Sequence, residues 1–425
     1  MRTASTSLLR LVITSVFMLT AHAVTAQTLT LAVQGDHFTV SGAPRFLLMV
    51  SYFDAMRRAN AANPNVPDPV TPSQTCQAGH NCGDLDTDFA YFKLHGYDGV
   101  RIFPNWRSCG PDPYDGLMTA SGDQATLPAE TDATWLRFRH VLDRARANNL
   151  VVDLSFSSET INGFKVGQDG GLTLASYQTQ VAEVARRLKS LYPNVFFDLQ
   201  NEFENNGLTQ ENIVGIANAT RKQDASRALT ASSSFGTAGH VAVLASLNIA
   251  APHDSRSDPN WYLDTTVGGL ISTTKSYLGT QVTPVYLQEP PPFAMQACGG
   301  TQTNEAASHH RSAARSAKLH GAAGWTFHTR STFSLSASTY VAKLGSNTTE
   351  QDELLAVPSA VRTPVDFNGD GRPDLVWQND TIRQAESSGI SEAPWAIPKW
   401  EIRTGTASHR STSRVASRRH WGCQW

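Results

Sequence analysis

The 425-residue sequence predicts an α/β fold, a (β/α)₈ barrel with a hairpin at its N-terminal end and a short C-terminal appendage. Eight short segments rich in Val, Leu, Ile and Phe recur between residues 46 and 328, as expected for parallel strands that are buried on both faces. Amphipathic helical segments separate several of them. The alternative is an open, doubly wound sheet, which favours a glycine-rich phosphate-binding turn after its first strand. Residues 51–56 (SYFDAM) contain no glycine, so the barrel is the better prediction.

The composition is that of an ordinary globular protein. Hydrophobic residues make up 40% of the chain and charged residues 17%, which allows a large buried core. The net charge is −2, and no basic stripe is concentrated in the first 350 residues. The chain therefore lacks the electrostatic signature of a nucleic-acid-binding protein.

The N-terminus has the pattern of a secretory signal peptide. Arg2 and Arg10 flank the start of an apolar run, residues 11–19, and small residues follow, with cleavage expected after Ala26. The run is too short for an ordinary membrane span. We therefore expect a secreted protein, extracellular or periplasmic, with no membrane association after cleavage; an uncleaved N-terminal anchor is the alternative.

A hairpin precedes the barrel. Residues 29–33 and 37–40 alternate apolar and polar side chains around Gly35-Asp36, and a second turn at residues 41–44 leads into the first barrel strand. The predicted strands are 46–52, 98–104, 150–156, 195–201, 228–234, 247–253, 284–290 and 321–328. The fifth and the eighth are the weakest by composition.

Helical periodicity separates these strands. The predicted helices are 84–95, 131–149, 174–191, 260–278 and 303–320, and Asp132 is expected to cap the second of them. The long segment 57–83 contains four prolines and two cysteines and is expected to form a loop on the catalytic face.

Export would allow the cysteines to pair. Cys76 and Cys82 flank a five-residue loop, which leaves Cys109 and Cys298 for each other, although four cysteines allow three pairings. A metal site that includes His80 is the alternative, but its spacing matches no common zinc pattern.

Two glutamates stand at the ends of predicted strands. Glu202 follows the fourth strand and Glu289 follows the seventh, and these strands lie across the barrel mouth from each other. Catalytic groups of barrel enzymes sit at the C-terminal ends of the strands. Two facing carboxyl groups are what glycoside hydrolysis requires, one as a proton donor and one as a nucleophile. Glu204 and Glu159 are the alternative candidates for the acid.

The ordered motifs resemble glycoside hydrolase clan A, in particular the cellulase- and mannanase-like family 5. The resemblance covers about residues 29–350. It rests on the Asn201-Glu202 pair, on Glu289, on the hairpin at residues 37–44 and on three further motifs, Gly99-Val100-Arg101-Ile102, Pro252-His253 and Gly324-Trp325. The sequence departs from the family pattern after Asp153-Leu154, where many members have a histidine, and it lacks the usual tyrosine near His253.

The resemblance implies roles for individual residues. Glu202 would be the general acid/base and Glu289 the nucleophile of a retaining enzyme, and Arg101 would keep Glu289 ionised. Asn201 would bind the sugar 2-hydroxyl. The remaining implied substrate contacts are His253, Trp325 as the floor of a sugar subsite, and Trp106 and Trp261 at outer subsites.

The C-terminal region contains a candidate calcium loop. Residues 366–374 read DFNGDGRPD, which places Asp366, Asn368, Asp370 and Asp374 at the spacing of an oxygen-ligand cage. The loop resembles an FG-GAP/VCBS-type repeat, and a polar turn without metal is the alternative. Residues 385–425 contain no aspartate and are rich in Ser and Arg. We expect the chain to divide into a signal peptide (1–26), the barrel (27–355), a partial repeat (363–384) and a tail without a fold (385–425).

These observations favour a secreted, monomeric glycosidase that acts on a β-linked poly- or oligosaccharide and needs no catalytic cofactor, with structural Ca²⁺ as the one expected metal. A catalytically inactive, carbohydrate-binding barrel is the first alternative. A calcium-dependent adhesion protein is the second, and it depends on the 366–374 loop alone.

Overall fold

The computed structural model describes residues 29–362, with gaps at 60–62, 68–72, 77–83, 107–115, 158–165, 167–170, 234–242, 245, 254–257, 292–307, 334, 336–338 and 346. For residues 63–67, 75, 76 and 84 it describes the backbone alone. The described residues belong to a unit whose C-terminal boundary is Thr363.

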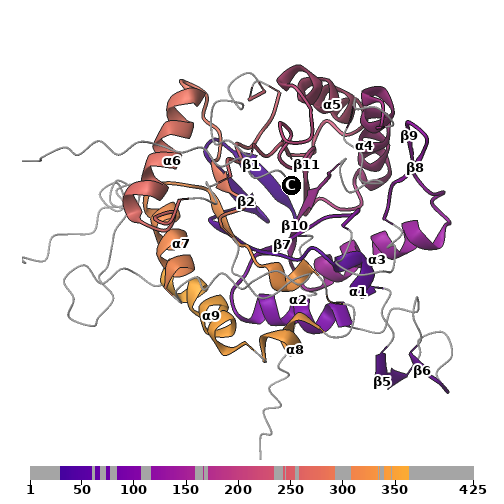
Figure 1. Cartoon of the computed structure of the whole chain (residues 1–425), viewed down its shortest axis with the longest axis horizontal. Helices are drawn as coiled ribbons and strands as arrows, with labels where there is room; N and C mark the ends of the chain where they lie inside the picture. The colour runs from indigo at the N-terminus through magenta and orange to yellow at the C-terminus, as the bar shows by residue number, and fades with distance from the viewer. Residues whose placement is uncertain are drawn as a thin grey trace, which may run out of the picture. The chain divides into compact units, whose positions relative to one another are not determined.

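A parallel sheet curls around the centre of this unit, and helices surround it (Figure 1). Its seven strands pair in the order β12-β11-β10-β7-β4-β14-β13. The strands are β4 (Leu47–Ser51), β7 (Gly99–Ile102), β10 (Val151–Ser155), β11 (Val195–Asp198), β12 (Leu229–Thr230), β13 (Tyr286–Leu287) and β14 (Gly324–Phe327). Each lies inside a segment that the sequence predicts to be a strand.

The sixth predicted strand closes the ring. Single parallel bridges join Ser233 to Pro252 and Ala250 to Val285, so this segment links the neighbourhood of β12 to that of β13. It is shorter than predicted, because Pro252 has no N–H group to continue a ladder. The fold class is nevertheless confirmed: eight parallel positions surround one axis, and the open-sheet alternative is wrong.

The predicted helices are confirmed with small changes at their ends. They are α2 (Asp84–Leu94), α3 (Ala133–Ala147), α4 (Leu174–Leu188), α6 (Asp264–Leu278) and α7 (His309–Leu319). The carboxylate of Asp132 accepts a 2.7 Å hydrogen bond from the Thr134 amide, as expected of an N-terminal cap.

Further helices were not predicted. These are α1 (Ala55–Ala59), α5 (Gln210–Gln223), α8 (Tyr340–Leu344), α9 (Thr348–Arg362) and a 3₁₀ turn at Arg330–Phe333. Helix α5 carries a detectable signal, since Ile213, Ile216, Ala217 and Thr220 are buried at helical spacing. None of the described helices has the length and hydropathy needed to cross a bilayer.

Two short antiparallel ribbons lie outside the barrel sheet. One joins β5 (Asn63–Pro67) to β6 (Thr75–Cys76), and the other joins β8 (Thr119–Ser121) to β9 (Gln124–Thr126). The first ribbon lies within the long segment that was predicted to be a loop.

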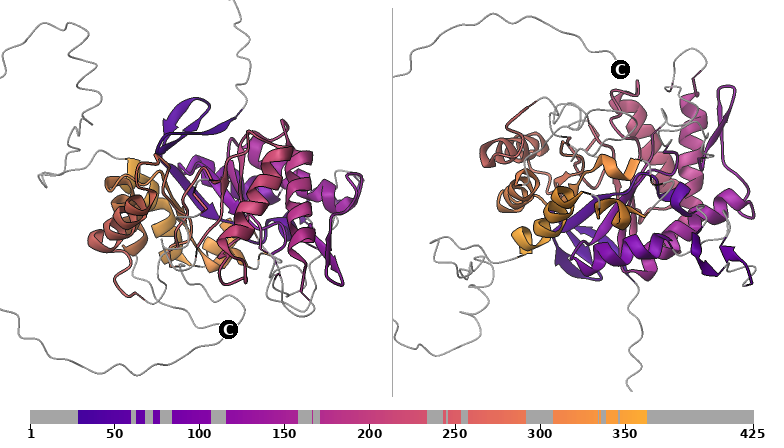
Figure 2. Two further views of the ribbon diagram at one scale, coloured as in Figure 1. Left: turned by 90° about the horizontal axis from the view of Figure 1, so that it is seen from above. Right: turned by 60° about the horizontal axis from the view of Figure 1, so that its bottom comes forward.

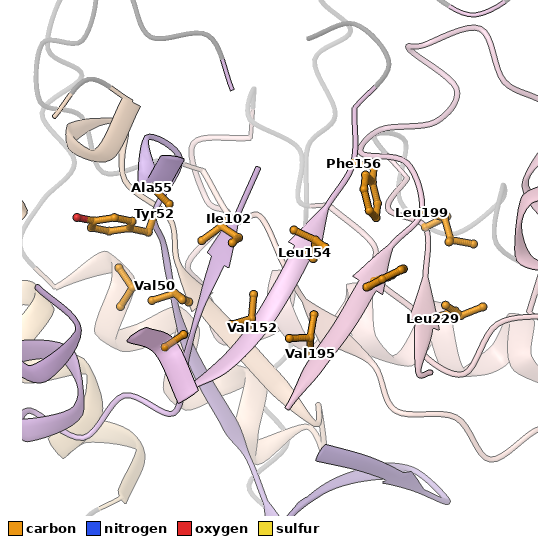
Figure 3. Close-up of a cluster of buried hydrophobic side chains, with 14 of the residues drawn as sticks. Val50, Tyr52, Ala55, Ile102, Val152, Leu154, Phe156, Val195, Leu199 and Leu229 are labelled. Atoms are coloured by element: carbon orange, nitrogen blue, oxygen red, sulfur yellow. The ribbon is translucent and has the colours of Figure 1, made fainter. Parts of the chain in front are cut away.

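Alternate strand residues face opposite sides of the barrel wall. Val50, Ile102, Val152, Leu154 and Val195 belong to the larger apolar cluster, which the strands share with the surrounding helices (Figure 3). The residues between them face the barrel interior. The interior therefore has its own, smaller set of side chains, and the strand register decides which residues belong to it.

The predicted hairpin closes one end of the barrel (Figure 2). It consists of β1 (Leu31–Gln34), β2 (His37–Val40) and β3 (Ala43–Arg45). From β2, the ring of Phe38 packs against Phe196 and Tyr286 with centroid separations of 6.0 and 6.2 Å. The same buried cluster contains Leu47, Met49, Val151, Ile249, Ala251 and Ala323. This apolar layer fills one end of the barrel, so polar interior residues gather at the other.

Candidate active site

A buried polar layer occupies the C-terminal ends of the barrel strands. Its members come from different strands or from the residues that follow them, and all face the barrel axis: Arg101, Asp153, Ser155, Asp198, Ser232, His253, Gln288, Glu289 and His328. Ionisable groups are rarely buried unless they are paired. The burial of so many ionisable groups at the C-terminal ends of the strands indicates a functional site, because active sites of barrel enzymes lie at this face.

The two predicted catalytic glutamates meet in this layer. Glu202, His253 and Glu289 each place one side-chain oxygen or nitrogen within 4.8 Å of the corresponding atoms of the other two. The glutamates come from opposite sides of the barrel, 87 positions apart in the chain. The structure therefore brings together the pair of carboxyl groups on which the predicted function depends.

Glu289 lies among nitrogen groups and has little contact with solvent. Its side chain is 4% exposed, and Arg101 Nη1 donates a 2.5 Å hydrogen bond to Oε2. The Nε2 atoms of His253 and His328 lie 3.9 and 3.7 Å from its two oxygens. A guanidinium so close to a carboxylate in a buried site strongly favours the ionised form.

The rest of the Arg101 guanidinium is also occupied. Nη2 donates to Asn201 Oδ1 at 2.6 Å and to Asp198 Oδ2 at 3.4 Å, and Nε donates to Ser155 Oγ at 2.9 Å. The planar group thus fixes the nucleophile candidate and Asn201 relative to each other. Lysine could not make this set of bonds from one position.

Two further carboxyl groups lie beneath Arg101, and both are fully buried. Asp153 Oδ2 is 3.7 Å from Arg101 Nε. Burial raises the pKa of Asp153 to about 7; Arg101 opposes this rise and Asp198 adds to it. Three buried carboxyl groups, those of Asp153, Asp198 and Glu289, thus surround one guanidinium. Protonation of Asp153 below neutral pH reduces the excess of negative charge.

Glu202 has a strained backbone and a more open side chain. Its φ is +44°, in the left-handed region that is uncommon for residues other than glycine. A hydrogen bond from its amide to Ser232 Oγ at 3.0 Å holds this conformation. The side chain is 20% exposed, and Oε1 lies 3.3 Å from His253 Nδ1. Backbone strain of this kind concentrates at functional sites.

His253 connects Glu202 to the buried layer. Its Nε2 lies 3.2 Å from Gln288 Oε1, and the Gln288 amide nitrogen donates to Asp153 Oδ2 at 2.8 Å and to Asp198 Oδ2 at 3.0 Å. A continuous hydrogen-bonded chain therefore runs from Glu202 through His253 and Gln288 to the buried aspartates.

The spacing of Glu202, His253 and Glu289 would also suit a metal ion, since carboxylate and imidazole are common ligands. The Nε2 atom of His253 faces the side-chain carbonyl oxygen of Gln288, which makes this nitrogen a donor and leaves Nδ1 as the ring nitrogen that faces Glu202. The same three groups can also hold and transfer protons without a metal.

An aromatic cluster adjoins Glu289. Phe53 packs on Phe103, Trp106 and Phe333 with centroid separations of 4.6, 4.6 and 4.3 Å, and it lies 5.5 Å from His328. Trp106 is partly exposed, and its indole N–H donates to the Phe333 carbonyl at 3.0 Å. The structure thus places Trp106 in an aromatic cluster that reaches His328, with part of its surface open to a ligand.

Comparisons with known proteins agree with this architecture. No family model matches the chain, and no curated protein matches it. Among solved structures, a protein described as a glycoside hydrolase superposes with a TM-score of 0.53 at 12% identity, covering 77% of this chain and 73% of that one. A glycoside hydrolase family 5 from Bacteroides vulgatus superposes with a TM-score of 0.50 at 13% identity, covering 72% of this chain and 63% of that one.

The chain has the fold of these glycoside hydrolases. At 12% and 13% identity, the likeness shows the fold alone.

The predicted floor of the sugar subsite needs correction. Trp325 is fully buried, and its ring packs against His310 of α7 and Phe327, with centroid separations of 6.0 and 6.4 Å. On β14, Trp325 and Phe327 face the helices, whereas Thr326 and His328 face the barrel interior. A ring with no exposed surface cannot stack on a sugar, so the prediction for Trp325 is wrong.

Trp261 is buried as well, 5.0 Å from the ring of His310, and it does not line the mouth of the barrel.

Several predictions fall outside the described residues. These are the signal peptide, Glu159, the calcium loop with Asp366, Asn368, Asp370 and Asp374, the C-terminal tail, and four of the five cysteines. The backbone of the fifth, Cys76, lies in β6.

Sequence reasoning missed His328, Gln288 and the two buried aspartates. Strand alternation could have found them. Asp153 faces inward because it lies in register with Arg101, and Asp198 faces inward because it lies in register with Ser155, two residues beyond Asp153. His328 lies two residues beyond Thr326 and Gln288 two residues beyond Tyr286, so each faces the same side as an interior residue.

Proposed function

We propose that the protein is a retaining glycosidase that cleaves O-glycosidic bonds of a β-linked poly- or oligosaccharide, with Glu289 as nucleophile and Glu202 as general acid/base. The approach of one oxygen of Glu202 to within 4.8 Å of one oxygen of Glu289 carries this proposal. Retaining enzymes hold their two carboxyl groups about 5–5.5 Å apart, whereas inverting enzymes separate them by about 6.5–9.5 Å to admit a water molecule.

The different surroundings of the two glutamates support the division of roles. Glu289 receives a hydrogen bond from a guanidinium and is 4% exposed, which suits an ionised nucleophile. Glu202 is 20% exposed and contacts an imidazole, which suits a group that gains and loses a proton.

The reaction would proceed in two displacements. In the first, Glu289 attacks the anomeric carbon while Glu202 gives its proton to the departing glycosidic oxygen, forming a glycosyl ester. In the second, Glu202 takes a proton from water, the water oxygen attacks the anomeric carbon, and the Glu289 carboxylate leaves.

Asn201 would bind the sugar ring. Its Oδ1 already accepts from Arg101, which directs the Nδ2 donor away from the guanidinium. An amide donor held beside the nucleophile suits the sugar 2-hydroxyl, whose hydrogen bond strengthens in the transition state. The partly exposed ring of Trp106 is the described aromatic surface best placed to stack on a sugar.

Export by the N-terminal signal and Ca²⁺ binding by residues 366–374 remain part of the proposal. An exported enzyme would meet polymeric glycans outside the cell, in keeping with a polysaccharide substrate.

The test is turnover of aryl β-glycosides and of a panel of β-glucans, mannans and xylans. We expect the unaltered protein to act on at least one of them. Glu202→Gln should slow cleavage of substrates with poor leaving groups by about 10²–10⁴-fold, the range of general acid catalysis. Glu289→Gln should abolish turnover of every substrate.

Glu204→Gln is the matched control. Glu204 lies two residues from Glu202 and accepts a hydrogen bond from Ser233 Oγ, so the change is chemically identical but outside the proposed pair. It should retain activity. Binding of a glycan without turnover would establish the inactive, carbohydrate-binding alternative. Loss of activity in Glu204→Gln with full activity in Glu202→Gln would transfer the acid role to Glu204.

A further inference from the structure

The side-chain amide of Gln288 has its orientation fixed by charge. Gln288 is fully buried at the end of β13, and its Nε2 lies 2.8 Å from Asp153 Oδ2 and 3.0 Å from Asp198 Oδ2. An amide nitrogen carries two hydrogens, and two carboxyl oxygens are available to accept them. Turning the amide over would place its carbonyl oxygen against Asp198 Oδ2, an oxygen that already accepts from Arg101 and Ser232, so the nitrogen must face it.

The carbonyl oxygen of Gln288 then faces His253. The distance from Oε1 to His253 Nε2 is 3.2 Å, and a carbonyl oxygen can only accept a hydrogen bond. Nε2 of His253 must therefore carry a hydrogen. The other ring nitrogen, Nδ1, lies 3.3 Å from Oε1 of Glu202.

The hydrogen on Nε2 determines whether the other ring nitrogen, Nδ1, faces Glu202 with a lone pair or with a hydrogen. If His253 is neutral, its single hydrogen is on Nε2, and Nδ1 presents a lone pair to Glu202. An ionised Glu202 would then face that lone pair with lone pairs of its own. The contact is favourable only when it holds a further proton, either on Glu202 Oε1 or on His253 Nδ1.

We propose that Gln288 is a positioning residue that holds the hydrogen of His253 on Nε2, so that the contact between Glu202 and His253 retains the proton delivered to the leaving group. This inference rests on the proposed acid/base role of Glu202 and extends it to a residue that does not touch substrate. Gln288 acts through His253, and the two buried aspartates act through Gln288.

The same device assists the second displacement. Once the proton has gone to the leaving oxygen, the Glu202 carboxylate faces the lone pair of Nδ1, which makes it a stronger base. It then removes a proton from the attacking water more readily, and the contact returns to its starting state. Glu202 loses one proton in the first displacement and regains one in the second, so the cycle leaves its protonation state unchanged.

Other charged groups surround this chain. Among the described residues, Glu289 lies 3.9 Å from His253 Nε2, Asp153 and Asp198 contact Gln288, and Arg101 contacts all three carboxyl groups. A second proton on the ring would be added at Nδ1 and would leave Nε2 protonated, so the proposal concerns which nitrogen carries the hydrogen in neutral His253.

Nitrogen-15 NMR of the histidine-labelled protein tests this directly. The His253 signals are assigned by their loss in His253→Gln, and the ring is observed at an alkaline pH above which its nitrogen shifts no longer change, where the contact has lost its proton. We expect hydrogen on Nε2 and none on Nδ1. Hydrogen on Nδ1 would overturn the proposal. The measurement needs no turnover, so it decides the tautomer even if the glycosidase proposal fails.

Gln288→Met tests the consequence for catalysis. Without the amide, neutral His253 can move its hydrogen to Nδ1 and donate to an ionised Glu202. The basic limb of the kcat/KM profile should therefore move to lower pH by about one unit. A limb that stays at the wild-type pH in a folded Gln288→Met protein would also overturn the proposal.

Thr326→Val is the control for loss of a buried polar contact in the same barrel interior. Its hydroxyl lies 2.7 Å from Tyr286 OH, and no contact with His253 is found for it among the described residues. This variant should be less stable, but the basic limb of its kcat/KM profile should stay at the wild-type pH. If Gln288→Met fails to fold, the NMR experiment on the unaltered protein still decides the proposal.

Discussion

Replacement of Asp153 by Asn should make the protein more stable at pH 8 relative to wild type and have little effect near pH 4. Burial raises the pKa of Asp153 from 3.8 to about 7, with Arg101 lowering it and Asp198 raising it further. In the unfolded chain Asp153 ionises near pH 4, whereas in the folded protein it remains protonated until about pH 7. The folded state thus binds a proton that the unfolded state has released, and stability falls as pH rises through this interval.

The magnitude follows from the width of the interval. A rise of the pKa from 3.8 to about 7 corresponds to at most about 4 kcal/mol, at 1.36 kcal/mol per unit. Asn cannot ionise, so this loss should disappear in the variant. Its carbonyl oxygen can replace Oδ2 as acceptor for Gln288 and Tyr286, and its amide nitrogen would face Ser155 Oγ, now 3.3 Å from Oδ1.

Urea unfolding at pH 4.5, 6 and 8 measures the effect. The difference in unfolding free energy between Asp153→Asn and wild type should grow in favour of the variant from the first pH to the last. Asp98→Asn is a control, because Asp98 accepts from Arg45 Nε at 2.7 Å and Arg362 Nη2 at 2.9 Å at the opposite end of the barrel. It should be destabilised at pH 8. Equal destabilisation of Asp153→Asn at all three pH values would refute the reasoning.

Four further predictions follow from the same contacts. Arg101→Met leaves buried carboxylates unpaired and should cost about 3–5 kcal/mol of stability as well as activity, with Arg101→Lys milder in unfolding assays. Phe38→Ala should cost about 3–5 kcal/mol without changing KM, because it empties the closed end of the barrel. Trp106→Ala should raise KM and also lower the melting temperature, because it removes the packing on Phe53 and Phe333, whereas Trp325→Ala should lower the melting temperature and leave KM unchanged. EDTA should not reduce the initial turnover rate, since the proposed chemistry uses only protein groups; a loss restored by a divalent cation would contradict it.

The strands could be predicted because a buried parallel strand is a continuous apolar run. Residues 150–156 and 195–201 are such runs, and β10 and β11 lie within them. The sixth strand is reduced to single bridges at Ala250 and Pro252. Its length could not be predicted, because an apolar run in the sequence does not show how many backbone N–H groups will pair. Helix α9 was not predicted, because it follows the last strand and the alternation of strands and helices predicts nothing beyond that point.

The proximity of Glu202 and Glu289 could be predicted for a geometric reason, because the C-terminal ends of barrel strands converge. Trp325 was assigned wrongly because its strand alone does not decide which way the ring faces. Side chains alternate along a strand, and the position of Trp325 turns its ring toward the helices. The roles of Gln288 and His253 depend on hydrogen-bond direction, which becomes visible only when the partners from four different strands are in place.

Trapping of a glycosyl-enzyme tests the central proposal most directly. A 2-fluoro aryl β-glycoside of the preferred sugar slows both displacements, and its good leaving group lets the first proceed faster than the second. Mass spectrometry of the digested protein should then find one sugar esterified to the peptide that contains Glu289, and none in Glu289→Gln. Turnover that gives a product of inverted anomeric configuration, or a sugar attached to another residue, would contradict the account.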